Sequence, residues 1–398
     1  MDHDVIVVGG GAVGLSTALH LARRTDHDIA VVEKEFHLAS HQSGRNSGVL
    51  HPGFNYEPGS LKARFATEGT RRMKAYCADN DIPVREFGVV VSAITRAEER
   101  RLEDLREQAE ANGAEAEIID EATLKEKEPH ARGRAALYAP EAASVDSQQY
   151  VYQLARDAQA EGVSLYVGTE VERLFRSDGG YRIDTTHGPL STSFLVNAAG
   201  LYADDLAEQV GVGSEYQIVP FRGEYYELVP DRRSLVNTMI YPTPDPDLPF
   251  LGVHYTRRTD DKVIIGPNAV LAFGREAYDN TDVDVGELGD TLTYDGFWRL
   301  LASPKMVKVA AAELNKSYRK EKFAAAAQRL VPEVTANDLV KSYAGIRAQI
   351  VREDGTLIKD PLFVGADDAI HVLNAVSPGL TASLPFGDHL AERIEDAF

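Results

Sequence analysis

A glycine-rich turn between an apolar strand and a helix sets the narrowest limit on how this chain folds. Residues 4–8 (DVIVV) form an apolar run typical of a buried strand, and the turn GGGAVG follows at residues 9–14. A helical pattern then leads to a second apolar run, Ile29–Val32, which ends at Glu33. This order predicts a βαβ unit that carries the dinucleotide-binding fingerprint G-x-G-x-x-G.

Each glycine of the fingerprint has its own physical role. Gly9 permits the tight turn, Gly11 lets the backbone approach a pyrophosphate, and Gly14 lets the helix pack closely on the strand. The phosphates are expected at the helix N-terminus, where free N–H groups and the helix dipole favour anions. Glu33, with Lys34 beside it, is expected to bind the ribose hydroxyl. An acid at this position disfavours a 2′-phosphate and therefore NADP.

The βαβ unit alone leaves FAD and NAD open, and two further features favour FAD. The unit opens the chain, which is usual where FAD is the resident cofactor. A later apolar strand, SFLVNAAG, ends in Ala199 and Gly200, small residues that let a backbone approach a ligand. Together with the strand and hairpin that begin near Val171, it predicts a wall around an adenosine.

Composition excludes several classes of protein. The 398 residues carry a net charge of −20, which disfavours binding to nucleic acid because phosphates would be repelled. Simple solubility or a halophilic host would each explain that charge. Cys77 is the single cysteine, so a disulfide framework or a thiolate metal site is not expected. The N-terminus resembles no signal peptide, and no run approaches the roughly 18 apolar residues of a membrane span. We expect a cytoplasmic protein with a possible peripheral contact on the inner face of the cell membrane.

The segment pattern predicts an α/β fold with two interleaved domains. Helices are expected over 60–80, 97–112, 121–128, 147–161 and most of 286–330, and strand structure over 84–94. Residues 216–269 are β-rich. We assign an FAD-binding, Rossmann-like domain to residues 1–80, 145–215 and 340–398. A β-rich substrate-binding domain takes 81–144 and 216–339.

Several longer motifs resemble one known family. These are HQSGRNSGVLHPGFNYEPGSLKARF, VPFRGEYYEL, IYPTPDPDLPFLGVHYT, GPNAVLAFGREAY and AGIRAQ. They are similar to the L-2-hydroxyglutarate oxidase/dehydrogenase family, part of the larger D-amino-acid-oxidase-like flavoproteins. The resemblance covers nearly the whole chain. It implies FAD-dependent oxidation of L-2-hydroxyglutarate to 2-oxoglutarate, with oxygen or a membrane quinone as electron acceptor. Two departures stand out: NAVSPGLTAS near the expected flavin ring, and Gly274 where the family usually has lysine.

The resemblance also implies which residues form the site. His51 and His254 are equal candidates for the base that takes the hydroxyl proton, since histidine titrates near neutrality. For each of them, a structural role, with a hydrogen bond to the flavin or the core, is an equal alternative. Arg347 is expected to hold the C1 carboxylate bidentately. The other predicted substrate-binding residues are Arg222, Tyr225, Tyr241, Asn268 and Arg275. Further predicted cofactor contacts are Ser43, Arg45, Ser47, Gly48, Gly345, Pro378, Gly379, Leu380 and Thr381, the last four just before a final helix. No metal site is predicted.

Two rival functions and one surface remain open from sequence. A sarcosine- or glycine-oxidase-type amine oxidase would need one carboxylate site and an aromatic cage for the amine. A non-catalytic dinucleotide-binding regulator would bind nucleotide without turnover. Phe297, Trp298 and Leu301 form either a core-facing stripe, the favoured interpretation, or a membrane-access patch.

Overall fold

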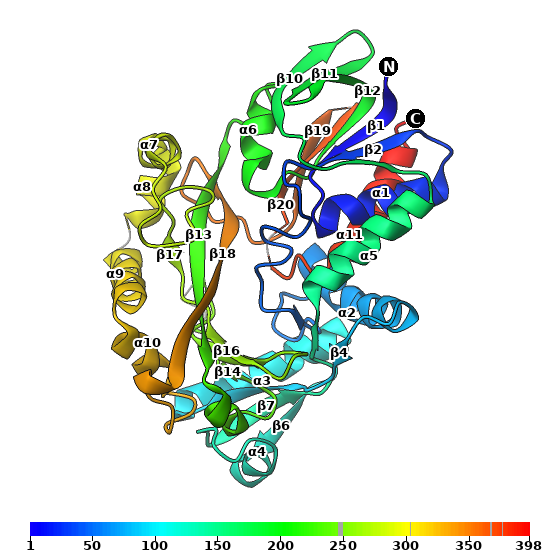
Figure 1. The fold of residues 1–398 in the computed structure, drawn as a ribbon. Coiled ribbons are helices and arrows are strands. Elements are labelled where there is room, and N and C mark those ends of the chain that lie inside the picture. Colours follow the sequence, from blue (N-terminus) through cyan, green and yellow to red (C-terminus); the bar gives the residue numbers. More distant parts are fainter. Residues whose placement is uncertain (246–249, 303, 367, 376) are drawn as a thin grey trace.

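The computed structural model describes residues 1–245, 250–302, 304–366, 368–375 and 377–398. Two large sheets, one at each end of the molecule, are joined by strands and loops that cross between them (Figure 1). The N-terminus and the C-terminus lie close together on the first sheet. The chain passes between the sheets several times, so neither domain is continuous in sequence.

The first sheet contains the predicted βαβ unit. β1 (His3–Val8) pairs in parallel with β2 (Ile29–Val32) and with β12 (Gly188–Asn197), and β2 pairs in parallel with β9 (Ser164–Tyr166). An antiparallel hairpin, β10 (Val171–Ser177) and β11 (Gly180–Thr185), continues from β12. On the C-terminal side β20 (Ala369–Asn374) pairs in parallel with β12, and β19 (Leu362–Ala366) pairs with β20. The carboxyl ends of the parallel strands therefore meet at one edge, where open α/β sheets bind ligands.

Helices cover the first sheet because their small residues permit close approach. α1 (Ala12–Arg24) packs against α5 (Ser147–Ala160) and α11 (Ser383–Glu395). A Cβ on Gly387 of α11 would lie 2.4 Å from the Ser16 hydroxyl oxygen, so only glycine allows this helix crossing. α2 (Leu61–Asp79) packs on α11 and is capped by Ser60, whose hydroxyl accepts the Ala63 N–H at 3.1 Å.

The second sheet is mixed and contains segments from both halves of the chain. Its order is β17 (Val270–Leu271), β13 (Tyr216–Leu228), β16 (Val263–Gly266), β15 (His254–Arg257), β14 (Met239–Pro242), β5 (Val89–Ala93), β7 (Ala135–Ala139) and β6 (Glu117–Asp120). The long strand β18 (Leu339–Arg352) pairs with β13 along its whole length. Sequence analysis grouped residues 340–352 with the nucleotide-binding segments, whereas in the structure these residues pair with the second sheet.

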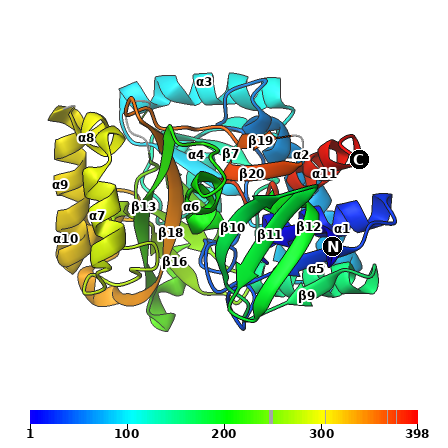
Figure 2. The same ribbon diagram turned by 90° about the horizontal axis from the view of Figure 1, so that it is seen from above.

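The remaining elements connect and flank the sheets. A small sheet of β3 (Val49–Leu50), β8 (Ala143–Val145) and β4 (Val84–Arg85) lies between them, so the strand structure expected over 84–94 consists of two strands, β4 and β5. Helices at the outer edge of the second sheet, seen together in Figure 2, are α7 (Val285–Thr293), α8 (Asp295–Leu301), α9 (Pro304–Tyr318) and α10 (Lys320–Ala327). The others are α3 (Arg96–Asn112), α4 (Glu121–Lys127), α6 (Ala203–Glu208) and the 3-10 turns η1 (Gly200–Tyr202), η2 (Pro230–Leu235) and η3 (Ala336–Asp338).

The helices expected over 60–80, 97–112, 121–128 and 147–161 are confirmed as α2, α3, α4 and α5. α3 has the capping box that its sequence predicts, with Thr95 and Glu98 bonding each other's backbone. No helix in the described part of the chain is long and apolar enough to cross a membrane. The stripe at residues 297–301 divides: Phe297 is 4% exposed and packs in the core, whereas Trp298 is 55% exposed.

Candidate active site

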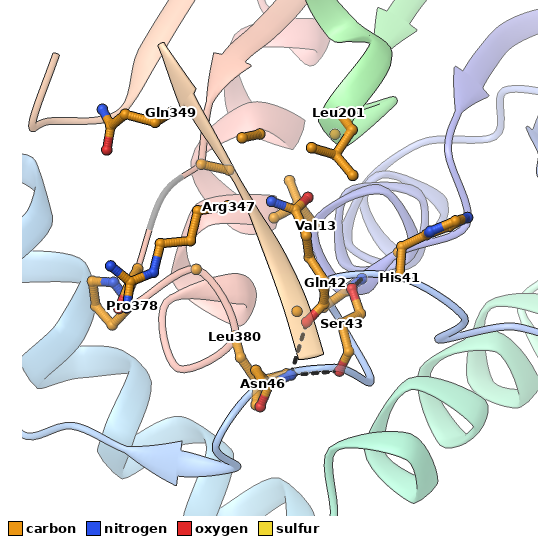
Figure 3. A pocket seen from close by; sticks show the side chains of 18 of the residues that line it. Val13, His41, Gln42, Ser43, Asn46, Leu201, Arg347, Gln349, Pro378 and Leu380 are labelled. Atoms are coloured by element: carbon orange, nitrogen blue, oxygen red, sulfur yellow. Dashed lines mark hydrogen bonds between the residues drawn. The ribbon is translucent and has the colours of Figure 1, made fainter. Parts of the chain in front are cut away.

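A single elongated cavity of about 1560 Å³ runs from the carboxyl edge of the first sheet to the inner face of the second. Its wall includes the glycine turn after β1, the end of β2, the loop before β3, the start of η1, strand β18 and the segment before α11. Figure 3 shows Arg347 extending from β18 into this cavity, with Leu380 and Asn46 on other parts of its wall. Both ends of the predicted site therefore belong to one continuous space.

The glycine turn has the geometry that the fingerprint requires. Gly9 has a φ of +108°, and a Cβ there would lie 2.4 Å from the Ala198 carbonyl oxygen. A Cβ on Gly14 would lie 2.0 Å from the Gly9 carbonyl oxygen, and one on Gly11 would lie 3.1 Å from the Ser43 hydroxyl. Side chains at these positions would separate α1 from the sheet or occupy the cavity. The turn thus leaves the first N–H groups of α1 facing the cavity wall.

Glu33 lies at the end of β2 as predicted and holds the turn in place. Its carboxylate accepts the Gly10 N–H at 2.7 Å and the Glu35 N–H at 2.9 Å. Each carboxylate oxygen has further lone pairs for a ribose hydroxyl. Lys34 also lines the cavity, but its ammonium pairs with Glu276 and, at 3.1 Å, with Glu35. Its charge is therefore engaged with protein carboxylates.

The loop before β3 forms the next part of the wall. The Ser43 hydroxyl accepts the Ala12 N–H at 2.9 Å and so ties the loop to the start of α1. The Arg45 guanidinium stacks over the Tyr278 ring, 4.2 Å from its centroid, and has no carboxylate partner among the described residues. Gly48 differs from its prediction because it does not line the cavity. It packs on β8, where a Cβ would lie 2.7 Å from a backbone oxygen.

The other predicted cofactor contacts line the cavity as a group: Ser47, Val171, Ala199, Gly200, Gly345, Pro378, Gly379, Leu380 and Thr381. Thr381 also has a structural task, since its hydroxyl donates to the Val49 carbonyl at 3.1 Å and accepts the His51 N–H at 3.3 Å. The final helix, α11, begins at Ser383, just after these residues as predicted. The dipole of α11 therefore points at this wall from just behind it.

Two histidines and a tyrosine occupy the end of the cavity nearest the second sheet. The ring of Tyr241 lies 4.3 Å from that of His254 and 6.3 Å from that of His51, measured between centroids. Burial lowers the pKa of His51 to about 3 and the pKa of His254 to about 4. Both imidazoles are therefore neutral at physiological pH. Tyr225 lines the same end, with the Ser47 hydroxyl next to its phenol.

The two histidines differ in the hydrogen bond that fixes each ring. His254 Nδ1 lies 2.9 Å from the Gly252 carbonyl oxygen, which only accepts, so Nδ1 carries the proton and Nε2 has a free lone pair. His51 Nδ1 accepts the Gly53 N–H at 3.4 Å, so its proton is on Nε2. One neutral ring is thus an acceptor toward the cavity, and the other is a donor.

Arg347 provides an unpaired positive charge. Its guanidinium lies over the Phe250 ring, 5.1 Å from the centroid, and makes no hydrogen bond or ion pair with any residue that the structure describes. Burial lowers its pKa, but arginine remains protonated in proteins. A desolvated cation without a protein partner is well suited to a carboxylate ligand.

Three predicted substrate-binding residues are not brought to the cavity wall. Arg222 is 3% exposed and donates to the Ala277 and Asp279 carbonyls and to Glu224. Asn268 is 2% exposed and bonds the Glu224 carboxylate at 2.6 Å. These groups face the packing between β13 and its neighbours, so their hydrogen-bonding capacity serves the fold.

Arg275 is the third of these residues. Its guanidinium is 5% exposed and pairs with Asp204 at 2.7 Å and with Asp205 at 2.6 Å. Sequence analysis made it a weaker candidate than Arg347 but kept it in the site, since both are arginines in motifs of the resembled family. In the structure the two arginines differ in their ion pairs. Arg275 pairs with carboxylates from a distant part of the chain, whereas Arg347 pairs with none that the structure describes.

The cavity also contains polar residues that sequence analysis missed. Lys62, in the first turn of α2, lines it together with Asn55 and Tyr56. The Asn55 Oδ1 atom is buried and has no hydrogen-bond partner among the described residues. All three residues lie in the motif HQSGRNSGVLHPGFNYEPGSLKARF. Lys62, a cation in that motif, is the residue from which the sequence could have predicted a further charge in the cavity.

Comparisons with known proteins agree with this geometry. The family model described as FAD dependent oxidoreductase matches residues 4–393, so the chain belongs to that family and uses FAD. The cavity fits this cofactor, with a glycine turn for the phosphates at one end and small-residue walls beyond it. When bound, FAD supplies a two-electron acceptor.

The most informative relatives are all named L-2-hydroxyglutarate dehydrogenase. The protein of Indibacter alkaliphilus is 40% identical over 397 residues, covering 98% of each chain. That of Escherichia coli K12 is 38% identical and covers 99% of this chain and 93% of its own. The mitochondrial protein of Bos taurus is 36% identical and covers 99% and 89%. The resemblance inferred from the motifs is confirmed.

Solved structures share the fold. L-alpha-glycerophosphate oxidase from Mycoplasma pneumoniae, with FAD bound, has a TM-score of 0.77 at 22% identity, covering 99% of this chain and 94% of its own. Glycine oxidase from Geobacillus kaustophilus has a TM-score of 0.74 at 22% identity, covering 99% and 95%. The predicted α/β fold of the glycine- and sarcosine-oxidase type is confirmed.

Proposed function

We propose that this protein oxidises L-2-hydroxyglutarate to 2-oxoglutarate with FAD. The observation that carries the proposal is the unpaired Arg347 guanidinium beside two neutral histidines, in the cavity that begins at the glycine turn. The names of relatives at 36–40% identity support the substrate. Bound FAD would supply the acceptor for the hydride of C2, while protein groups bind the carboxylate and take the hydroxyl proton.

In this proposal the two histidines have different roles. His254 is the base, because its Nε2 lone pair faces the cavity while Nδ1 donates to the Gly252 carbonyl. His51 donates from Nε2 to a ligand oxygen, because its Nδ1 already accepts a backbone N–H. Arg347 holds the C1 carboxylate, and the phenols of Tyr225 and Tyr241 orient the substrate from the inner face of the second sheet.

The domain assignment follows the sheets. We propose that the first sheet with α1, α2, α5 and α11 binds FAD, and that the second sheet with β18 and α7–α10 forms the substrate-binding domain. The substrate then lies where the two domains face each other across the cavity.

For the electron acceptor we propose a membrane quinone, reached by peripheral contact, with oxygen as the alternative. The support is the group of helices α8–α10, which carries exposed apolar side chains and exposed lysines. Trp298, Val307 and Tyr318 are 55%, 54% and 59% exposed, and the exposed Lys308 and Lys322 lie on the same group of helices (Figure 2). In a chain of net charge −20, such a basic amphipathic surface suits anionic lipid headgroups.

Anaerobic flavin absorbance tests the reaction. Bleaching by L-2-hydroxyglutarate, but not by the D-acid or sarcosine, is the expected result. Bleaching by sarcosine or glycine instead would replace the proposal by an amine oxidase. No bleaching by any of these would leave a dinucleotide-binding protein without this activity.

Sedimentation with vesicles tests the membrane contact. We expect binding to anionic vesicles but not to neutral ones, and loss of that binding in Lys308→Glu. Equal binding of Lys308→Glu and the wild type to anionic vesicles would refute the proposal that this surface contacts the membrane.

A further inference from the structure

Lys62 is a second cation that faces the cavity without a partner. It lies in the first turn of α2, and its ammonium stands over the Tyr56 ring, 4.8 Å from the centroid. It makes no ion pair with any carboxylate in the described ranges. Burial lowers its pKa to about 8, with the positive charge of Arg347 acting in the same direction. The fold therefore holds this ammonium in a place where water does not solvate it fully.

The nearest acid does not neutralise Lys62 directly. Asp360 also lines the cavity, and its charge raises the pKa of Lys62. Its Oδ1 atom instead receives the Lys62 backbone N–H, at 3.4 Å. Lys359, the other cation on this part of the wall, is exposed to solvent. Lys62 and Arg347 are thus the two enclosed and unpaired cations at this end, within the described part of the chain.

The two cations and the two histidines line the same cavity, and each cation acts on a different histidine. The charge of Lys62 contributes to the lowered pKa of His51, whereas the charge of Arg347 contributes to that of His254. A 2-hydroxy acid needs one cation for the carboxylate next to the reacting carbon. A second desolvated cation opposes folding unless a second anion compensates it.

We propose that Lys62 binds the distal carboxylate of the substrate and makes the site select dicarboxylic over monocarboxylic 2-hydroxy acids. This inference rests on the proposed function and names the residue that sets its substrate class. Arg347 fixes the C1 carboxylate, Lys62 fixes the far end, and C2 is held between them beside His254. Arg222, which sequence analysis placed among the substrate-binding residues, donates its hydrogen bonds within the fold, and Lys62 takes the place of a second substrate-binding cation.

The test compares Lys62→Met, Lys62→Arg and Lys74→Met as FAD-loaded enzymes. Lys74 lies on the same helix but pairs with Glu86 at 2.8 Å, so it is a matched control. Calorimetry measures the Kd of glutarate, an unreactive dicarboxylate, and of butyrate, a monocarboxylate. Lys62→Met is expected to weaken glutarate binding about 10- to 100-fold and leave butyrate binding unchanged. Lys62→Arg should retain most of the affinity, and Lys74→Met all of it.

Kinetics give a second measure. With L-2-hydroxyglutarate, Lys62→Met should raise KM about 10- to 100-fold with a smaller change in kcat. Equal weakening of glutarate and butyrate, unchanged glutarate binding, or loss of FAD from Lys62→Met would overturn the inference. If glutarate binding depends on Lys62 but the wild type oxidises no 2-hydroxy acid, the proposed function fails while the dicarboxylate site stands.

Discussion

Replacing Arg347 by methionine should cost activity without costing stability. Methionine keeps most of the volume but removes the guanidinium that we assign to the C1 carboxylate. Loss of a buried, charge-assisted pair costs about 3–4 kcal/mol of binding, which corresponds to roughly a 100- to 1000-fold fall in kcat/KM. FAD content should stay at the wild-type level. Steady-state kinetics with L-2-hydroxyglutarate and flavin absorbance measure both quantities.

Thermal unfolding supplies the matched comparison, because Arg275 is also buried but has carboxylate partners. Arg275→Met leaves Asp204 without its cation, which typically costs about 3–5 kcal/mol. An unfolding entropy of about 2.1 cal/mol/K per residue gives about 0.8 kcal/mol/K for 398 residues, hence a fall in Tm of about 4–6 °C. Arg347 has no such partner, and its ring contact is worth only about 0.5–1 kcal/mol. The Tm of Arg347→Met should therefore differ from that of the wild type by less than about 2 °C.

The reasoning fails if the two variants behave alike. A large fall in Tm for Arg347→Met would show that its charge stabilises the fold. A large rise in KM for Arg275→Met, at a temperature where the variant is folded, would return that residue to the substrate site.

Two further predictions concern the glycine turn and the histidines. Gly14→Ala should weaken FAD binding at least about tenfold, since its Cβ would meet the Gly9 oxygen at 2.0 Å, whereas Gly289→Ala, with open space around it, should not; fluorescence titration of FAD measures both. His254→Gln should lower kcat about 100-fold or more, and His51→Gln should lower it less. Because the folded pKa of His254 is about 4, below the unfolded 6.5, stability is full above 6.5 and falls as the pH drops toward 4. kcat/KM should fall as the pH approaches 4. In His254→Gln, both stability and kcat/KM should depend less on pH in this range. An unchanged pH dependence of the two quantities would contradict the assignment of His254 as the base.

The local parts of the fold could be predicted from sequence. The turn at residues 9–14, the helix after it and the acid at the end of β2 follow from spacing and periodicity over about 30 residues. The boundary at 340 could not be predicted, because β18 pairs with β13 more than a hundred residues earlier in the chain. Strand pairing over such distances leaves no local pattern.

The candidate site shows the same division. Sequence alone determined that this chain folds around a dinucleotide at a glycine turn, since the strand, the three glycines and the helix lie within one short stretch of the chain. It also supplied the cations that a dicarboxylate requires, but tertiary structure decided which of them remain free. Arg275 meets Asp204 and Asp205 across the fold and is neutralised, while Arg347 and Lys62 meet no carboxylate partner and face the cavity. The function of a charged side chain depends on the groups that surround it, and those groups come from parts of the chain that only the tertiary structure brings together.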